Sequence, residues 1–355
     1  MQPTSRLPGL DGLRALAALA VVLGHIVAGL VELGIPGTPL GSDLVVRVPL
    51  LKDFASLSVT VFFSLSGFLI TYLFLMEERL RLVQVRTFYM RRILRIWPLY
   101  YTYMVGSGLL LWHFGEQIDW PAVGLSALLF ANLSPLLSLS PMLIFHYWSL
   151  GVEEQFYLFY PWLFRLRRWR WHIISGLCLL FIGLNGWLVV SFGGKHGPHT
   201  SYKIHYAYLL IGALGAGAYH RGWHRFFLHR SIQLGTWLLL GVMAAYTTPL
   251  HSFIWVHELL ACFTVLLIWG QATGRGIISL EWRPLRFLGR ISFGIYILHP
   301  AVIFVVTRYW RVLGYTSWID YACVFGLIFG LTILLASLSY QYLEAPFLRM
   351  KRHYA

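Results

Sequence analysis

Long apolar runs separated by short polar connections dominate the chain and predict helices that cross a membrane. A helix needs about 20 apolar residues to span the hydrocarbon core of a bilayer. On that basis we expect ten spans, near residues 10–32, 54–76, 92–113, 145–164, 172–192, 203–220, 232–248, 252–270, 289–310 and 319–343. The pattern therefore predicts an all-α fold, a polytopic bundle of transmembrane helices.

The apolar stretch at 121–139 is ambiguous, because it is long enough to count as an eleventh span. The basic residues argue against a full crossing there. If residues 121–164 make one net crossing, 22 of the 28 Lys and Arg residues fall on the same side as both termini. Cytoplasmic loops carry an excess of Lys and Arg, so we expect cytoplasmic termini and a re-entrant or surface-lying segment at 121–139.

Composition agrees with a membrane protein. Of the 355 residues, 58% are hydrophobic and 12% are charged, which is too apolar for a soluble domain. The net charge of +14 would suggest nucleic acid in a soluble protein, but here the basic residues flank apolar segments and set the topology. We expect a single integral-membrane domain over residues 1–355, located in the cell inner membrane, with the lipid bilayer and no nucleic acid as a partner.

The first predicted span contains two ionisable residues, Arg14 and His25. They are 11 positions apart, so they differ by roughly 20° around a helix and lie about 16 Å apart along it. Arg14 then lies near the cytoplasmic boundary, and His25 lies near the middle of the bilayer. A neutral imidazole can take a proton from a hydroxyl and return it without a metal, so we expect His25 to act as a general base.

The spacing of these two residues also resembles the reach of a pantetheine arm. An anionic carrier bound near Arg14 would then present its thioester near His25. Two alternatives stay open: Arg14 can simply anchor the helix at the membrane boundary, and His25 can be a core histidine that bonds to a neighbouring helix.

A second basic group, Arg91, Arg92 and Arg95, lies at the predicted cytoplasmic start of the third span. Arg92 and Arg95 are three residues apart and share a helix face, where two guanidinium groups could hold phosphate oxygens. We also expect the helix N-terminus to favour an anion there. The alternative is a topology cluster that contacts lipid headgroups, which we favour for Arg91.

The segment 146–161 carries two carboxylates, Glu153 and Glu154, inside an apolar span. A carboxylate in a membrane must be paired, protonated or hydrated. We expect one of the two to orient His25 and to stabilise its protonated form. The sequence does not show which one, so both are candidate catalytic residues. A structural ion pair with an arginine is the alternative.

Several further residues could line a substrate cavity. Tyr296 and His299 precede a proline-marked kink, and Gln155 and Trp148 flank the glutamates. Small residues at 62–70, 211–220 and 288–300 are typical of helix packing, which is the default interpretation for Ser66, although it is also a cavity candidate. The three cysteines have no metal-ligand spacing, and we expect no metal site and no permanently bound cofactor.

The ordered set of motifs LDGLRALAALAVVLGH, FFSLSGFLI, RRILRIWPLYY, WSLGVEEQFYLFYP, SFGIYILHP and YLEAPF resembles the membrane-bound acyltransferase family 3. The resemblance spans nearly the whole chain. It implies ten helices with cytoplasmic ends, and acyl transfer from cytoplasmic acyl-CoA, commonly acetyl-CoA, to a hydroxyl of a carbohydrate such as exopolysaccharide, O-antigen or a lipid-linked glycan. The chain resembles the stand-alone type, without a periplasmic esterase-like domain.

In family terms, Arg14 and His25 match the first-helix motif, and Arg92 and Arg95 match the proposed carrier-binding RxxR. Residues 153–155 match the acidic motif. We therefore expect acyl-CoA as co-substrate and direct attack by a hydroxyl that His25 deprotonates, although an acyl-histidine intermediate remains open. The alternatives are a small hydrophobic acceptor, such as a macrolide or a peptide, and a secondary transporter or flippase. The sequence leaves the oligomeric state open.

Overall fold

The apolar segments of the chain form helices. The computed structural model describes residues 6–32, 50–80, 83–139, 141–196, 205–245, 255–310 and 318–351. Within these ranges every regular element is a helix, so the prediction of an all-α fold is confirmed. Each of the ten predicted spans overlaps one of the helices. Residues 203–204, 246–248 and 252–254 of three predicted spans lie outside the described residues.

Five helical segments of the described residues are long and apolar enough to cross a membrane. They are Leu10–Leu30, Ala55–Arg79, Arg170–Leu188, Ser292–Trp310 and Trp318–Met350. The protein is thus a polytopic membrane protein. Only 22% of the apolar window is buried in Arg170–Leu188 and in Trp318–Met350, compared with 61% in Ala55–Arg79 and in Ser292–Trp310. Arg170–Leu188 and Trp318–Met350 therefore leave most of their apolar surface available to lipid.

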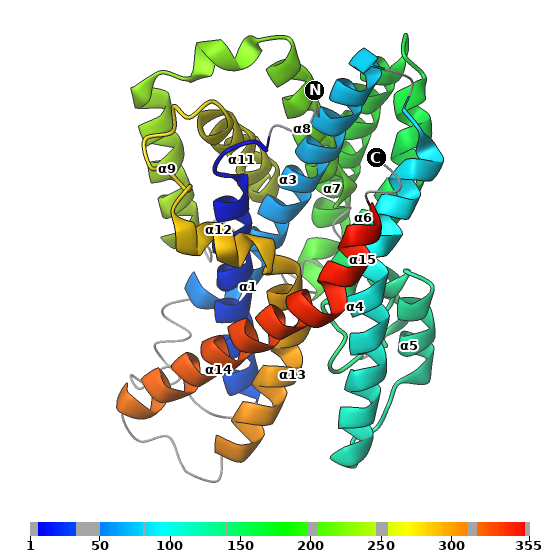
Figure 1. Cartoon of the computed structure of the whole chain (residues 1–355), viewed down its shortest axis with the longest axis vertical. Helices are drawn as coiled ribbons and strands as arrows, with labels where there is room; N and C mark the ends of the chain where they lie inside the picture. Colours follow the sequence, from blue (N-terminus) through cyan, green and yellow to red (C-terminus); the bar gives the residue numbers. More distant parts are fainter. Residues whose placement is uncertain are drawn as a thin grey trace. The chain divides into compact units, whose positions relative to one another are not determined.

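The contacts between residues divide the chain into two units. Unit 1 comprises residues 1–17, 56–83 and 152–289. It contains the start of α1 (Leu10–Glu32), most of α3 (Leu50–Leu80), most of α6 (Tyr147–Arg165), α7 (Arg170–His196), α8 (Tyr206–His220), η4 (Trp223–Phe227), α9 (Arg230–Ala245), α11 (Val256–Ala272) and all but the last residue of α12 (Arg283–Arg290). In this unit, α8 lies between α7 and α11, and α9 packs on α11 (Figure 1).

Glycines allow two helices of unit 1 to approach backbone to backbone. A Cβ atom on Gly67 of α3 would lie 1.9 Å from the carbonyl oxygen of Leu209. A Cβ atom on Gly212 of α8 would lie 2.0 Å from the carbonyl oxygen of Ser64. The small residues at 62–70 and 211–220 therefore serve helix packing, as their sequence indicates.

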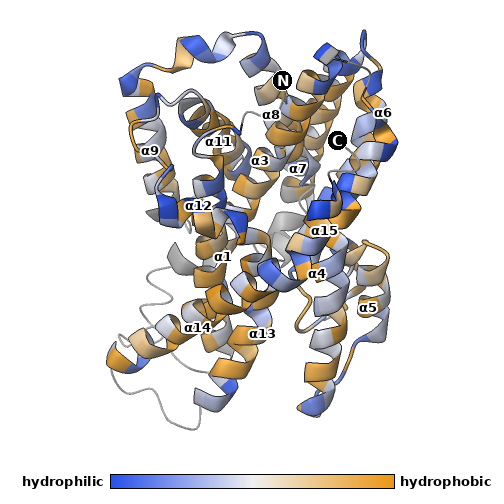
Figure 2. Ribbon diagram, viewed as in Figure 1, coloured by the Kyte–Doolittle hydropathy of each residue, from blue (hydrophilic) through white to orange (hydrophobic). Residues whose placement is uncertain are grey.

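Unit 2 comprises residues 18–55, 84–151 and 290–355. It contains the rest of α1, α4 (Val85–His113), α5 (Trp120–Ala127), η1 (Ala131–Leu133), η2 (Pro135–Leu137), the first turn of α6, α13 (Ser292–Trp310), α14 (Trp318–Ser339), the π-helical turn η5 (Tyr340–Glu344) and α15 (Ala345–Met350). Helix α13 packs along α14, and η5 and α15 lie against α4 (Figure 1). Figure 2 shows hydrophobic residues along most of α14, whereas hydrophilic residues mark α12.

The ambiguous segment 121–139 forms no membrane-length helix. It contains the eight-residue α5 and two short 3-10 turns, η1 and η2. Eight residues of α-helix extend only about 12 Å, less than half the hydrocarbon thickness. Asp119 caps α5 by accepting a hydrogen bond from the backbone N–H of Ala122 at 3.0 Å. The segment therefore does not supply an eleventh spanning helix, as the charge distribution predicted.

Candidate active site

His25 of α1 pairs with His299 of α13 inside unit 2. The Nδ1 atom of His25 lies 2.8 Å from the Nε2 atom of His299. The two rings are parallel within 1°, with centroids 5.0 Å apart. Phe145 packs against His25 nearly at a right angle, with ring centroids also 5.0 Å apart. Two residues that the sequence assigned to different roles, general base and cavity lining, are therefore direct hydrogen-bond partners.

The partners of His299 determine which nitrogen of each ring carries a proton. Nδ1 of His299 lies 3.2 Å from the carbonyl oxygen of Ile295, which can only accept a hydrogen bond. In the neutral ring, Nδ1 of His299 therefore carries the proton, and its Nε2 is an acceptor. His25 must then donate from Nδ1. As a neutral ring, His25 is left with an unprotonated Nε2, the form that a general base requires.

A proline follows His299 within α13. Proline has no backbone N–H, so Pro300 cannot donate to the carbonyl oxygen of Tyr296 one turn earlier. The histidine that the sequence marks by its neighbouring proline is therefore the one that bonds to His25.

His146 completes a group that we call the histidine cluster: His25, His146 and His299. The ring of His146 lies 5.5 Å from that of His299, measured between centroids. His146 is 1% exposed and His299 is 0% exposed, whereas His25 is partly exposed. In the part of the chain that the structure describes, no three His, Cys, Asp or Glu side chains converge in a way that could hold a metal ion.

Two hydroxyl groups hold the backbone at His146. The hydroxyl of Tyr296 donates to the carbonyl oxygen of His146 at 3.0 Å and lies 2.5 Å from Oγ of Ser149. Tyr296 and Ser149 are both buried. Tyr296 therefore contacts the backbone of the cluster, whereas Ser149 was absent from our expectations. Its signal was position: Ser149 lies three residues after His146 and one turn before Glu153 on α6.

Arg14 lies on the same continuous helix as His25, so their predicted shared face is consistent with α1. Nη1 of Arg14 is 3.3 Å from Oδ1 of Asp11, one turn earlier. Asp11 also accepts a hydrogen bond from Nε of Arg6 at 2.8 Å. Asp11, which we did not anticipate, thus neutralises part of the charge of Arg14. The role of Arg14 in binding a carrier stays a prediction.

The expected helix N-terminus at Arg92 and Arg95 is wrong. Helix α4 begins at Val85, so both arginines lie well inside it, beyond the first turn where the helix dipole acts. The sequence misled because polar residues at 84–92 obscured the start of the helix. The two side chains do share a face three residues apart, and Arg92 lies over the Phe88 ring at 5.6 Å.

The π-helical turn η5 ends at Glu344, a buried carboxylate that belongs to the YLEAPF motif. Glu344 lies within electrostatic range of Arg95, and Oγ of Ser339 donates to it at 3.3 Å. Turns of this kind insert one extra residue into a helix and are frequent at functional sites. The YLEAPF motif is visible in the sequence, but the proximity of Glu344 to Arg95 is not.

Glu153, Glu154 and Gln155 are partly exposed residues of α6 in unit 1. Gln155 accepts a hydrogen bond from the hydroxyl of Tyr206. The predicted pairing of a glutamate with His25 joins residues of different units and stays a prediction. The hydrogen bond at Nδ1 of His25, however, is made by His299.

The remaining cavity candidates are Trp148 on α6 and Ser66 on α3, and both are partly exposed. Ser66 adjoins Gly67, the residue whose backbone contacts Leu209. A substrate role for Trp148 or Ser66 stays a prediction.

The chain is similar to known proteins over nearly its whole length. A family model described as an acyltransferase domain matches residues 7–337. A Staphylococcus aureus (strain COL) protein whose provisional name is O-acetyltransferase is 26% identical over 96% of this chain. The O-acetyltransferase OatA of Staphylococcus aureus (strain NCTC 8325 / PS 47) is 25% identical over the same share. The chain spans 57% of the length of each of these relatives. No solved structure matches the chain.

Proposed function

Because the chain belongs to the membrane-bound acyltransferase family 3, we propose that it is an O-acyltransferase that uses His25 as its general base. The relatives named for O-acetyl transfer support an acetyl group as the acyl unit. The donor is cytoplasmic acyl-CoA, and the acceptor is a hydroxyl of a carbohydrate such as exopolysaccharide, O-antigen or a lipid-linked glycan. The enzyme acts from the cell inner membrane.

The hydrogen bond between His25 and His299 is the observation that carries this proposal. A histidine buried among apolar groups needs a partner that fixes its tautomer before it can work as a base. Two consecutive hydrogen bonds, from His299 to the Ile295 carbonyl and from His25 to His299, leave Nε2 of His25 with its lone pair. His25 is also the member of the cluster that keeps an exposed part.

The reaction then follows in two proton transfers. Nε2 of His25 takes the proton of the acceptor hydroxyl while its oxygen forms a bond with the carbonyl carbon of the thioester. The bond to Nε2 gives His25 a positive charge, and its Nδ1–H bond to His299 becomes charge-assisted. When the tetrahedral adduct collapses, the carbon–sulfur bond breaks and the CoA thiolate takes the proton from Nε2 of His25. The products are an ester and free CoA, with His25 neutral again.

Arg92 and Arg95 are the proposed binding residues for the phosphates of the carrier, with Arg14 assisting. Two guanidinium groups on one helix face can hold phosphate oxygens by several charge-assisted hydrogen bonds. Glu344 lies within electrostatic range of Arg95, so its carboxylate would repel a phosphate bound there whenever it is ionised. Glu153 and Glu154 are proposed to stabilise the positive charge that His25 gains during the reaction.

A test of this function supplies the purified protein, in lipid nanodiscs, with acetyl-CoA labelled in the acetyl group. With a hydroxyl acceptor present, we expect CoA release and a labelled ester in equal amounts, detected by mass spectrometry. Movement of a solute across the membrane without consumption of the CoA ester would contradict the proposal and favour a transporter. Mass spectrometry of surface glycans, with and without the gene, would identify the acceptor.

The same assay without an acceptor separates direct attack from a covalent route. In the direct route, the protein retains no label, because the acetyl group leaves CoA only when a hydroxyl attacks. A labelled acetyl group found on His25 by peptide mass spectrometry would instead support an acyl-histidine intermediate.

A further inference from the structure

A cavity at one end of unit 1 brings together basic residues from three helices. Its volume is about 240 Å³, and its lining residues are Leu75, Glu78, Arg79, Arg170, Trp171, Gly217, His220 and Arg221. We call this cavity the arginine pocket. The predicted catalytic and carrier-binding residues do not line it. Three guanidinium groups and one carboxylate share the cavity, which gives it an excess of positive charge.

The single carboxylate of the arginine pocket is fully used. Oε1 of Glu78 accepts a hydrogen bond from Nε of Arg167 at 2.7 Å, and Oε2 accepts one from Nη1 of Arg170 at 2.6 Å. Among residues with described side chains, Arg79 and Arg221 form no ion pair with a carboxylate. Two positive charges of the pocket therefore have no carboxylate partner of their own among those residues.

Aromatic rings hold two of the guanidinium groups in place. Arg170 lies over the Phe164 ring at 4.4 Å, and Arg221 lies over the Trp171 ring at 5.3 Å. A Cβ atom on Gly217 would lie 2.4 Å from the Trp171 ring, so this glycine gives the indole its position against α8. A guanidinium stacked on a ring still presents its N–H groups at its edge, the geometry that binds an oxyanion.

Nitrogen atoms in the arginine pocket keep donor capacity. Nε of Arg170 is buried and has no hydrogen-bond partner among the described residues. Nη2 of Arg79 lies 3.5 Å from Nε2 of His220, which must accept because arginine only donates. The helix dipoles also stabilise the cations Arg79 and Arg221 at the C-terminal ends of α3 and α8. This stabilisation does not require the two side chains to line the same cavity.

We propose that the arginine pocket binds a phosphate group, carried by an anionic phospholipid headgroup or by a soluble phosphate compound. Phosphate suits the site because its oxygens can accept from several guanidinium edges at once, which a single carboxylate cannot do. Trp171 and Trp223 flank Arg221, and tryptophan is enriched where a membrane meets water. This site is separate from the proposed acyl transfer, so its test is binding and not catalysis.

The test uses the full chain in nanodiscs and has two arms. In the first arm, nanodiscs of phosphatidylcholine alone are titrated with inorganic pyrophosphate, and binding is measured by thermophoresis. In the second arm, nanodiscs contain phosphatidylcholine and phosphatidylglycerol, and native mass spectrometry counts the phosphatidylglycerol that the released protein retains. Binding in the first arm identifies a soluble source of the phosphate, and retention in the second identifies a lipid source.

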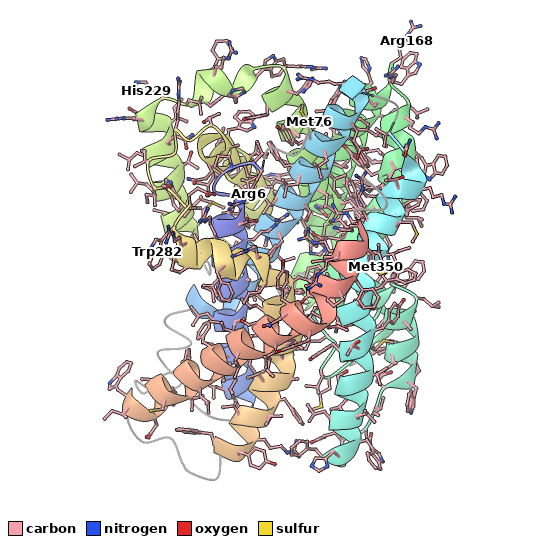
Figure 3. All side chains as sticks on the ribbon, viewed as in Figure 1. Arg6, Met76, Arg168, His229, Trp282 and Met350 are labelled. Carbon is pink, nitrogen blue, oxygen red and sulfur yellow. The ribbon has the colours of Figure 1, made fainter. Side chains whose placement is uncertain are left out.

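The deciding variant is the double substitution Arg79→Gln and Arg221→Gln, which removes the two charges without a carboxylate partner. We expect it to weaken binding by about tenfold or more in the arm that is positive, because charge-assisted hydrogen bonds are lost. The matched control is Arg168→Gln with Arg225→Gln. Both residues are exposed and neither lines the cavity. Arg225 lies in the same α8–α9 connection as Arg221, and Figure 3 shows Arg168 at the outside of the α6–α7 connection, two residues before Arg170.

The proposal is supported if the control binds the probe as tightly as the wild-type protein and the deciding variant binds it more weakly. The proposal is overturned if neither probe binds the wild-type protein, or if the control loses as much affinity as the deciding variant. If the double variant does not elute as a folded protein, the single variants Arg79→Gln and Arg221→Gln are compared with Arg168→Gln in the same way.

Discussion

The histidine cluster of unit 2 and the arginine pocket of unit 1 each contain a histidine bonded to another nitrogen, with opposite results. In the cluster, the acceptor is Nε2 of His299, so His25 donates a proton and keeps a lone pair at its other nitrogen. In the pocket, the donor is Arg79, so His220 uses its Nε2 lone pair to accept. The partner, and not the residue type, decides whether a histidine has a lone pair to offer.

The two regions also differ in charge and burial. Two rings of the cluster are almost completely buried and neutral groups surround it, whereas the pocket contains exposed arginines. Desolvation disfavours charge, which keeps a buried imidazole neutral at rest, with one nitrogen lone pair available. Exposed guanidinium groups keep their charge and attract anions. One region is thus suited to moving a proton and the other to holding a fixed negative charge.

The largest effect should come from removing the base. We expect His25→Ala to lower the rate of acetyl transfer by about a hundredfold to ten-thousandfold, because the acceptor hydroxyl keeps its proton. The rate of CoA release in the presence of acceptor measures this loss. The matched control is His172→Ala, which removes an exposed histidine that packs near Trp169. A His25→Ala protein that is folded and nearly as active as the control would exclude His25 from the chemistry.

A smaller loss should follow when His25 keeps its ring but loses its orienting partner. We expect His299→Ala to lower kcat by about tenfold to a hundredfold with little change in KM, since His299 is fully buried and acts through His25. His299→Gln should recover part of the rate, because its amide oxygen can accept from Nδ1 of His25. A purely structural role for His299 predicts no such rescue and no change in the pH profile of kcat.

Charge removal on α4 should act on binding and leave the chemical step intact. We expect Arg92→Gln or Arg95→Gln to raise KM for acetyl-CoA by about tenfold, the cost of losing charge-assisted hydrogen bonds to phosphate. Arg91→Gln serves as the control with the same change in charge on the neighbouring position. Steady-state kinetics with varied acetyl-CoA measure KM for each variant. Equal increases in KM for all three variants would contradict specific binding by Arg92 and Arg95 and indicate a general electrostatic attraction of the carrier to α4.

The smallest effect should come from Tyr296→Phe, which removes the hydroxyl that holds the His146 carbonyl. We expect a loss of about 1 kcal/mol in the free energy of unfolding, the typical contribution of one buried hydrogen bond. A thermal unfolding scan in detergent measures it. Transfer activity falling as far as it does in His299→Ala would show that Tyr296 acts in the reaction itself.

The sequence predicted the helices well because apolar runs of this length have few other stable forms. It also identified 121–139 as a segment without a full crossing, since a misplaced span would have reversed the side of many arginines. Its error at α4 arose where polar residues precede the apolar run, so that hydropathy conceals the first turns of a helix that begins at Val85.

The sequence could name His25, His299 and Tyr296 as candidates but could not join His25 to His299. Residues separated by 274 positions meet only through helix packing, which local patterns do not encode. Ser149 and Asp11 were missed for a related reason: a serine or an aspartate near a helix end is common, and only its neighbours reveal its role. Glu344 lies in a π-helical turn within electrostatic range of Arg95, and no residue pattern in YLEAPF specifies such a turn.

That π-helical turn has a consequence for how the C-terminal part of the family's motif can vary. One residue more than a regular helix needs is accommodated at Tyr340–Glu344. The wide turn absorbs this residue locally, because its hydrogen bonds span five residues where an α-helix spans four. A one-residue deletion in a regular α-helical turn would rotate everything downstream by about 100° around the helix axis. A deletion within Tyr340–Glu344 would instead replace the wide turn with a regular one and leave the faces of α15 where they are. Single-residue length changes are therefore better tolerated here than elsewhere in the C-terminal helices.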